Sequence, residues 1–231
     1  MVNSQAKLKE INAQGRAYDF IKESILSLSF RALAHLSAEN IAASLGISRT
    51  PVREALSRLE QDGLVVKGEM NGFYVRPITL KEIIDTYKVR EALEVAAGLE
   101  ALPYIDGSIM KRLEILIEKS ATLLDPQKYA EFVSVNRLFH AEIIGATKNS
   151  MLEKIMDPIH DRVRLVGATL ILKHAPRQQE VYEENKFILE AFKSKDPVMV
   201  KFAIENHIKK AKEHIMKLAK DDAEKIILGP F

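Results

Sequence analysis

Two arginines in the stretch SRTPVREALSRLEQDGLV, residues 48–65, have the spacing to bind a nucleic acid. Arg49 and Arg53 lie one helical turn apart, so both side chains project from the same face of a helix. A guanidinium group can bind a guanine edge through two hydrogen bonds, or it can neutralise a backbone phosphate. Ser48 and Thr50 place hydroxyl groups at the same end of the stretch.

The neighbouring residues predict the helix that positions the two arginines. An apolar stripe at helical spacing would pack inward, formed by Val52, Ala55, Leu56 and Leu59. Ser48 can act as the N-cap, Pro51 fits the first turn, and Gly63 ends the helix. The alternative is a solvated helix face on which the arginines pair with Glu54 or Glu60.

The residues on either side of this helix favour a role in nucleic-acid binding. GRAYDFIKESILSLSF, residues 15–30, predicts an amphipathic helix, and LSAENIAASLG predicts a short one capped by Ser37 and ended by Gly46. A β-hairpin is predicted after Gly63, because two β-rich runs flank Asn71-Gly72. This order is typical of a helix-turn-helix followed by a wing.

The whole chain has the composition of a globular protein. It has 231 residues, of which 47% are hydrophobic and 29% charged, with a net charge of +2 that lies in the first 77 residues. The absence of Cys excludes disulfides and thiol catalysis. The first ten residues are polar, and the longest nearly apolar run, Leu165–Leu172, is too short to span a bilayer. We therefore expect a cytoplasmic protein with no membrane partner.

The second part of the chain reads as helical throughout. Six segments have helical character, at about 79–101, 106–124, 126–146, 149–173, 177–194 and 197–222. Their expected caps are Asp106, Asp125, Asn149 and Asp196, and Pro158 should kink a helix or start one. The sequence thus predicts a mostly α fold with two domains. These are a winged helix-turn-helix with a small β-hairpin wing over 1–77 and an antiparallel six-helix bundle over 78–231.

The motif SRTPVREALSRLEQDGLV with its Asn-Gly wing resembles the GntR family of bacterial transcription regulators. The helical part is similar to the FCD ligand-binding domain of that family's FadR subfamily, through VREALEVAAGLEA, NRLFHAEIIGATKN and ENKFILEAFKSKDPVMVKFAIENHI. The resemblance implies a homodimer that binds an inverted-repeat DNA operator and either releases it or binds it better when a small-molecule effector occupies the FCD domain. Of the two regulatory roles, the resemblance favours a repressor. By motif position, the operator contacts would be Ser48, Arg49, Thr50, Arg53 and, in the wing, Gly72.

Four polar residues lie on the expected inner faces of the bundle. They are Asn136, His140, Asn185 and His207. Buried polar groups need partners or a ligand. The resemblance implies a divalent metal, Zn or Ni, held by an Asp, a His four residues later and two more His, and these four residues occupy the matching positions. Because two of the four are Asn, which are weaker ligands, the alternative is a polar cluster around an organic ligand with no ion.

Arg90 in YKVREALE matches a position that faces the cavity in such domains, where it would favour an anionic, carboxylate-bearing effector. Its alternative is a surface pair with Glu94. The other histidines, at positions 35, 160, 174 and 214, have no grouping in the sequence and are expected in surface or packing roles.

Two other classes of function remain open from the sequence. One is a helical metal-dependent enzyme that uses His140 and His207, although no HExxH motif, Gly-rich phosphate loop or Ser/His/Asp set occurs. The other is a dimeric DNA-binding protein without an effector.

Overall fold

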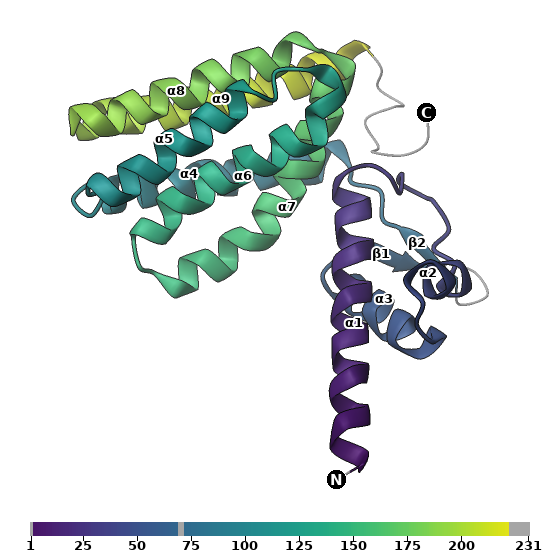
Figure 1. Ribbon diagram of the computed structural model, residues 1–231. Helices are drawn as coiled ribbons and strands as arrows, with labels where there is room; N and C mark the ends of the chain where they lie inside the picture. The colour runs from purple at the N-terminus through teal and green to yellow at the C-terminus, as the bar shows by residue number, and fades with distance from the viewer. Residues whose placement is uncertain (1, 69–71, 222–231) are drawn as a thin grey trace. The chain divides into compact units, whose positions relative to one another are not determined.

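The computed structural model describes the backbone of residues 2–68 and 72–221 and the side chains of 12–68 and 72–218 (Figure 1). These residues form two compact units, which divide in the sequence between Ile78 and Thr79.

Three helices form the framework of the first unit: α1 (Val2–Leu26), α2 (Ala38–Leu45) and α3 (Arg49–Gln61). α1 packs on α3 through a fully buried stripe that includes Ala17 and Ile21. The side chain of Ser37 accepts a hydrogen bond from the backbone N–H of Asn40, and Gly46 ends α2 with φ +63°. The predicted cap and stop of α2 are confirmed.

The first helix differs from its prediction at both ends. It was expected over residues 15–30, but it begins at Val2 and ends at Leu26. Leu28 has φ +62°, and the N–H of Phe30 donates to the carbonyl of Ser24 over 2.8 Å. A left-handed residue with such a closing bond is a common way to end a helix, and it can occur without glycine.

The hairpin consists of β1 (Val65–Lys67) and β2 (Phe73–Val75), which are antiparallel with Val65 opposite Val75. The predicted tip residue Asn71 lies outside the described residues. On its other side β2 bonds to the segment before α2: the N–H of Leu33 donates to Val75, and the N–H of Val75 donates to Ala34. This added pairing, which the sequence did not predict, fixes the wing to the helical framework.

The second unit is helical, and its elements follow the predicted order. They are α4 (Leu80–Ala101), α5 (Gly107–Ala121), the 3-10 turn η2 (Pro126–Lys128), α6 (Tyr129–Ala146), α7 (Ser150–Lys173), α8 (Pro176–Ser194) and α9 (Pro197–Asp221). α4 packs against α6, α7 and α9, while α5 packs against α6 and α8 (Figure 1). The mostly α fold with a winged helix-turn-helix and a helical bundle is confirmed.

The predicted caps hold the ends of these helices. Asp106 accepts hydrogen bonds from two backbone N–H groups at the start of α5, and Asn149 accepts one at the start of α7. Asp125 begins η2 rather than α6, so the segment expected to be one helix starts with a 3-10 turn. Pro158 does not start a helix, because α7 continues on both sides of it.

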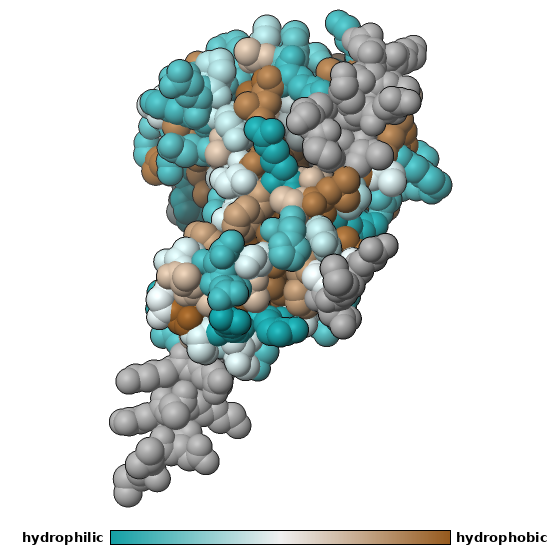
Figure 2. Space-filling model, turned by 90° about the vertical axis from the view of Figure 1, so that its right-hand side faces the viewer, coloured by the Kyte–Doolittle hydropathy of each residue, from teal (hydrophilic) through white to brown (hydrophobic). Residues whose placement is uncertain are grey.

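No helix in the described part of the chain is both long and apolar enough to cross a membrane. The face seen in Figure 2 mixes hydrophilic and hydrophobic residues.

Candidate functional site

The N-terminal end of α3 presents the predicted contact residues together. Ser48, Arg49, Thr50 and Arg53 are all exposed. The stripe behind them is buried, since Val52, Ala55, Leu56 and Leu59 have no exposed area. The apolar stripe therefore anchors the helix and leaves its polar end in solvent.

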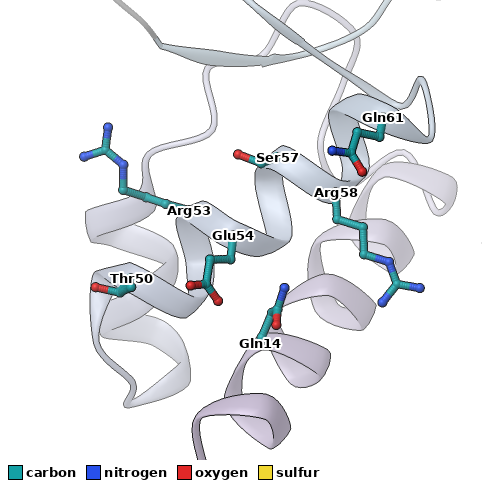
Figure 3. A pocket seen from close by; sticks show the side chains of 7 residues that line it. All are labelled: Gln14, Thr50, Arg53, Glu54, Ser57, Arg58 and Gln61. Atoms are coloured by element: carbon teal, nitrogen blue, oxygen red, sulfur yellow. The ribbon is translucent and has the colours of Figure 1, made fainter. Parts of the chain in front are cut away.

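Arg49 has an ion-pair partner that the sequence did not indicate. Its Nη2 atom lies 2.5 Å from Oε1 of Glu39 at the start of α2, and both side chains are about two-thirds exposed (66% and 65%). Glu60 pairs instead with Lys67 over 2.8 Å. Arg53 has no ion pair within the described residues, and it lies on the same side of α3 as Thr50 (Figure 3).

Ser48 occupies the N-cap position, as predicted, but its side chain makes no capping hydrogen bond. The missing hydrogen bond is explained by the residue at the third position of the helix. A serine cap commonly bonds the N–H of the third helical residue, and here that residue is Pro51, which has no N–H. The Ser48 hydroxyl is thus left available to an external acceptor.

A pocket between α1 and α3 adds polar side chains beside the arginines (Figure 3). It is lined by Gln14, Thr50, Arg53, Glu54, Ser57, Arg58 and Gln61. The Arg58 guanidinium stacks 4.3 Å above the ring centre of Tyr18, whose hydroxyl donates to Asp62 over 2.7 Å. Arg58 was not among the predicted contact residues, and this stacking fixes its position next to them.

Gly72 directly precedes β2, at the loop end of the wing, where a side chain would be crowded. A Cβ atom there would lie 3.1 Å from the ring of Tyr74 and 3.4 Å from Nε2 of His35. The N–H of Gly68 donates to the carbonyl of Gly72 over 2.9 Å and closes the hairpin. Glycine therefore lets the Tyr74 ring pack over the wing.

In the second unit the five predicted residues meet inside the bundle. We use the name buried cluster for these residues and their charged neighbours: Arg90, Glu94, Asn136, His140, Arg177, Glu184, Asn185 and His207. All except Asn136, which is half-buried, are at most 4% exposed. They come from four helices, α4, α6, α8 and α9.

Arg90 lies between the two histidines. Its Nη2 atom is 3.4 Å from Nε2 of His140 and 3.2 Å from Nε2 of His207. The two imidazole rings stack with their centres 5.0 Å apart. The other ring nitrogen of each histidine faces a carboxylate, since His140 Nδ1 lies 2.8 Å from Glu94 and His207 Nδ1 lies 2.8 Å from Glu184. These contacts favour the tautomer with a proton on Nδ1 and a lone pair on Nε2.

The electrostatics of the cluster keep the carboxylates charged and the imidazoles neutral. Burial lowers the pKa of His207 to about 4 and lowers that of His140 as well. Burial alone would raise the pKa of Glu184, but hydrogen bonds from His207 and Arg177 outweigh it and lower that pKa to about 2. The Glu94 pKa falls well below its usual range in the same way, through Arg90 and His140.

The buried charges balance. Arg90 donates to Glu94 over 2.6 Å, and Arg177 donates to both carboxylate oxygens of Glu184 over 2.7 and 2.9 Å. Among the described residues, three arginines and three acids are buried: Arg90, Arg164 and Arg177 with Glu94, Asp161 and Glu184. With neutral histidines their formal sum is zero.

Sequence reasoning missed several members of this arrangement. For Arg90 the sequence offered a surface pair with Glu94 as the alternative to a place in the cavity; the pair with Glu94 forms, but it is buried. Arg177 and Glu184 lie seven residues apart, on one face of α8, and this spacing was the available signal. Three of the four histidines thought to be isolated also have charged neighbours. His160 Nε2 lies 3.5 Å from Glu94, and His174 stacks on His214.

The geometry does not fit a divalent ion between these histidines. Both Nε2 atoms, which would be the ligands, face the positively charged guanidinium of Arg90. The two amides bond to each other, with Asn185 Nδ2 donating to Asn136 Oδ1 over 2.6 Å. The side-chain oxygen of Asn185, Oδ1, is buried without a hydrogen-bond partner in the described structure. Beside the cluster is a cavity of about 40 Å³, whose lining includes Arg90, Asn136 and His207.

Comparison with known proteins follows the two units. Residues 13–75 match the bacterial regulatory proteins of the gntR family, and residues 85–210 match the FCD domain, which is more than half of the chain. The chain belongs to the GntR family. It is therefore a transcriptional regulator of that family with an FCD domain, and not the metal-dependent enzyme that the sequence left open.

Relatives in this GntR family span both units. The HTH-type transcriptional regulator YdhC of Bacillus subtilis is 26% identical over 90% of this chain and 92% of its own length. The gluconate operon transcriptional repressor of the same organism is 30% identical over 71% of this chain and 69% of its own length. The solved structure of McbR/YncC from E. coli has the same fold, with a TM-score of 0.79 over 89% of this chain and 98% of the other at 22% identity.

Proposed function

We propose that the N-terminal unit binds a specific DNA operator through Ser48, Arg49, Thr50 and Arg53, with Gly72 of the wing close to the minor groove. The observation that carries this proposal is the exposed polar end of α3 on a fully buried apolar stripe. Among the residues that the structure describes, Arg53 has no ion-pair partner, and the ion pair of Arg49 is exposed, so it costs little to exchange for a guanine or phosphate.

We further propose that the protein acts in the cytoplasm as a homodimeric repressor on an inverted repeat. A dimer with twofold symmetry presents two copies of α3, so its operator has the same symmetry. The name of the Bacillus subtilis gluconate operon repressor supports the repressor role.

The FCD domain is proposed to bind a small carboxylate effector at the buried cluster without a divalent ion. Arg90 supplies a bidentate cation, and Asn136, His140, Asn185 and His207 supply polar contacts. Two observations support this proposal: Arg90 occupies the position between the imidazoles, and the buried oxygen of Asn185 lacks a partner.

The size of the cavity indicates how an effector would act. About 40 Å³ holds one or two water molecules, whereas small-molecule sites measure roughly 300–1,000 Å³. A metabolite therefore has to displace side chains of several helices when it binds. Such a displacement offers a physical route from the cluster to the rest of the protein.

The test combines operator selection with effector screening. Full-length protein is used to select DNA from a random pool, and the selected site is then titrated in the presence of a panel of mono- and dicarboxylic acids. We expect an inverted repeat whose binding one acid changes at least tenfold, and loss of that response in Arg90→Met. A selected site that responds to no acid would leave an effector-independent DNA-binding protein as the better description.

A further inference from the structure

A second cluster of ionisable residues lies outside the buried one. His174 follows the end of α7, Glu180 lies in the second turn of α8, and His214 lies near the end of α9. We refer to these three residues as the surface triad. Each is partly exposed, with 42%, 39% and 27% of the respective side chains open to solvent. We propose that the surface triad is a binding site for a divalent transition-metal ion of the zinc or nickel type.

The positions of the ligand atoms support this proposal. Nε2 of His214 lies 2.9 Å from one carboxylate oxygen of Glu180, and Nε2 of His174 lies 3.7 Å from the other. The three ligand atoms all lie within 4.8 Å of one another. In a tetrahedral zinc site, ligand atoms are separated by about 3.4 Å, so rotamer adjustments of partly exposed side chains bring the triad into range.

The ligand types select the class of ion. Two imidazoles and one carboxylate form a set that zinc uses in proteins, with water as the fourth ligand, and the exposure of the triad admits that water. Calcium and magnesium prefer sets made of oxygen atoms. The stacked imidazole rings, 5.4 Å between centres, are compatible with neutral ligands, and burial lowers the pKa of His214.

Arg177 is the group that competes for Glu180. Its Nη1 atom lies 3.1 Å from the same carboxylate oxygen that His214 approaches. However, Arg177 is already neutralised by Glu184, which accepts two shorter hydrogen bonds from it. A metal ion can therefore bind the carboxylate of Glu180 while the buried charge of Arg177 stays paired with Glu184. By joining the segment between α7 and α8 to α9, the ion would stabilise the folded state.

Calorimetry with ZnCl₂ and NiCl₂ on full-length protein tests the site. The protein carries no polyhistidine tag and is treated with EDTA and dialysed beforehand. We expect one ion per chain with a Kd in the micromolar range or tighter, and at least tenfold weaker binding in His214→Gln and in Glu180→Gln. His35→Gln, an exposed histidine of the other unit, is the matched control and should bind as the wild type does.

A second pair of measurements keeps the result interpretable. The circular dichroism and the Tm of His214→Gln and Glu180→Gln in EDTA should equal those of the wild type, and zinc should raise the Tm of the wild type and of His35→Gln but not of these two variants. His140→Gln separates this site from the buried cluster and should retain the ion. The proposal is overturned if the wild type binds no ion at 1 mM, if calcium binds equally well, or if binding is lost in His140→Gln and kept in His214→Gln.

Discussion

Arg49 and Glu39 form an ion pair of 2.5 Å that joins the start of α3 to the start of α2. The carboxylate neutralises one of the guanidinium groups that we propose to contact DNA, and it adds a negative charge beside the phosphates. Glu39→Gln should therefore increase operator affinity by a few-fold, since an exposed ion pair contributes about 0.2–1 kcal/mol. Fluorescence anisotropy with a labelled operator measures the change. An unchanged or lower affinity would mean that Glu39 positions Arg49 rather than competing for it.

Removal of the arginines should have the opposite effect. Arg49→Ala and Arg53→Ala should each weaken specific binding by about 1–3 kcal/mol, or roughly fivefold to 150-fold, while the protein stays folded because both side chains are exposed. Lys209→Ala, an exposed cation of α9, is the control. Gel-shift titration against random competitor DNA gives the specific component. Equal affinity of wild type and both variants would remove α3 from the interface.

Salt dependence tests the proposed dimer. Two copies of α3 on an inverted repeat neutralise several phosphates, so the logarithm of affinity should fall steeply and linearly with the logarithm of salt concentration. Footprinting at two salt concentrations should show two protected half-sites lost together. A single protected half-site, bound by a monomer in sedimentation, would contradict the dimer.

The amide pair in the bundle allows the metal hypothesis to be tested directly. If an ion binds the buried cluster, the double variant Asn136→Asp and Asn185→His should bind Zn or Ni much more tightly, because carboxylate and imidazole are better ligands than amides. If an organic acid binds Arg90 directly, the same variant should lose its effector response, because the new carboxylate repels the ligand. Titrations with the metals and with the effector distinguish the two outcomes. The surface triad is removed in both proteins by His214→Gln.

Acid should destabilise the FCD domain through the buried cluster. The pKa of Glu184 is about 2 in the folded protein against 4.5 ordinarily, so its contribution, of order 3 kcal/mol, is present above pH 4.5 and lost as the pH falls towards 2. The pKa of His207 is about 4 in the folded protein against 6.5 in the unfolded chain. The unfolded chain therefore takes up this proton first, and the stability also falls as the pH drops from 6.5 to 4. Urea unfolding at pH 7.5, 5.5, 4 and 2.5 measures the sum.

The matched variants for this pH dependence are Glu184→Gln and Glu183→Gln. The first leaves Arg177 buried without its partner, so it should cost about 3–5 kcal/mol at pH 7.5 and reduce the loss of stability between pH 4.5 and pH 2. The second changes an exposed residue and should stay within about 0.5 kcal/mol of the wild type. Equal stability of Glu184→Gln and wild type at pH 7.5 would show that the ion pair is not stabilising.

The elements of the fold could be predicted because their signals are local. Ser37 and Gly46 bound α2, and the apolar stripe of α3 has the helical period. The end of α1 could not be predicted, because Leu28 is not a residue type that favours a left-handed conformation. The pairing of β2 with residues 33–36 was also missed, since it joins segments far apart in the sequence.

For the buried cluster, the polar residues on inner helix faces could be predicted, but their partners could not. Asn136, His140, Asn185 and His207 were identifiable because they interrupt apolar stripes. The role of Arg90 depends on which side chains α6 and α9 bring to α4, and no periodicity within one helix contains that information. The surface triad was missed for the same reason, since its members come from three elements.

The charge balance of the buried cluster has a consequence for ligand binding. An anion that entered this site would leave it with a net negative charge in a medium of low dielectric constant. Protonation of His207 or His140 restores neutrality, and a bound carboxylate raises the affinity of both imidazoles for a proton. We therefore expect anion binding here to be linked to proton uptake: its heat should vary with the ionisation enthalpy of the buffer, and its affinity should rise as the medium is acidified.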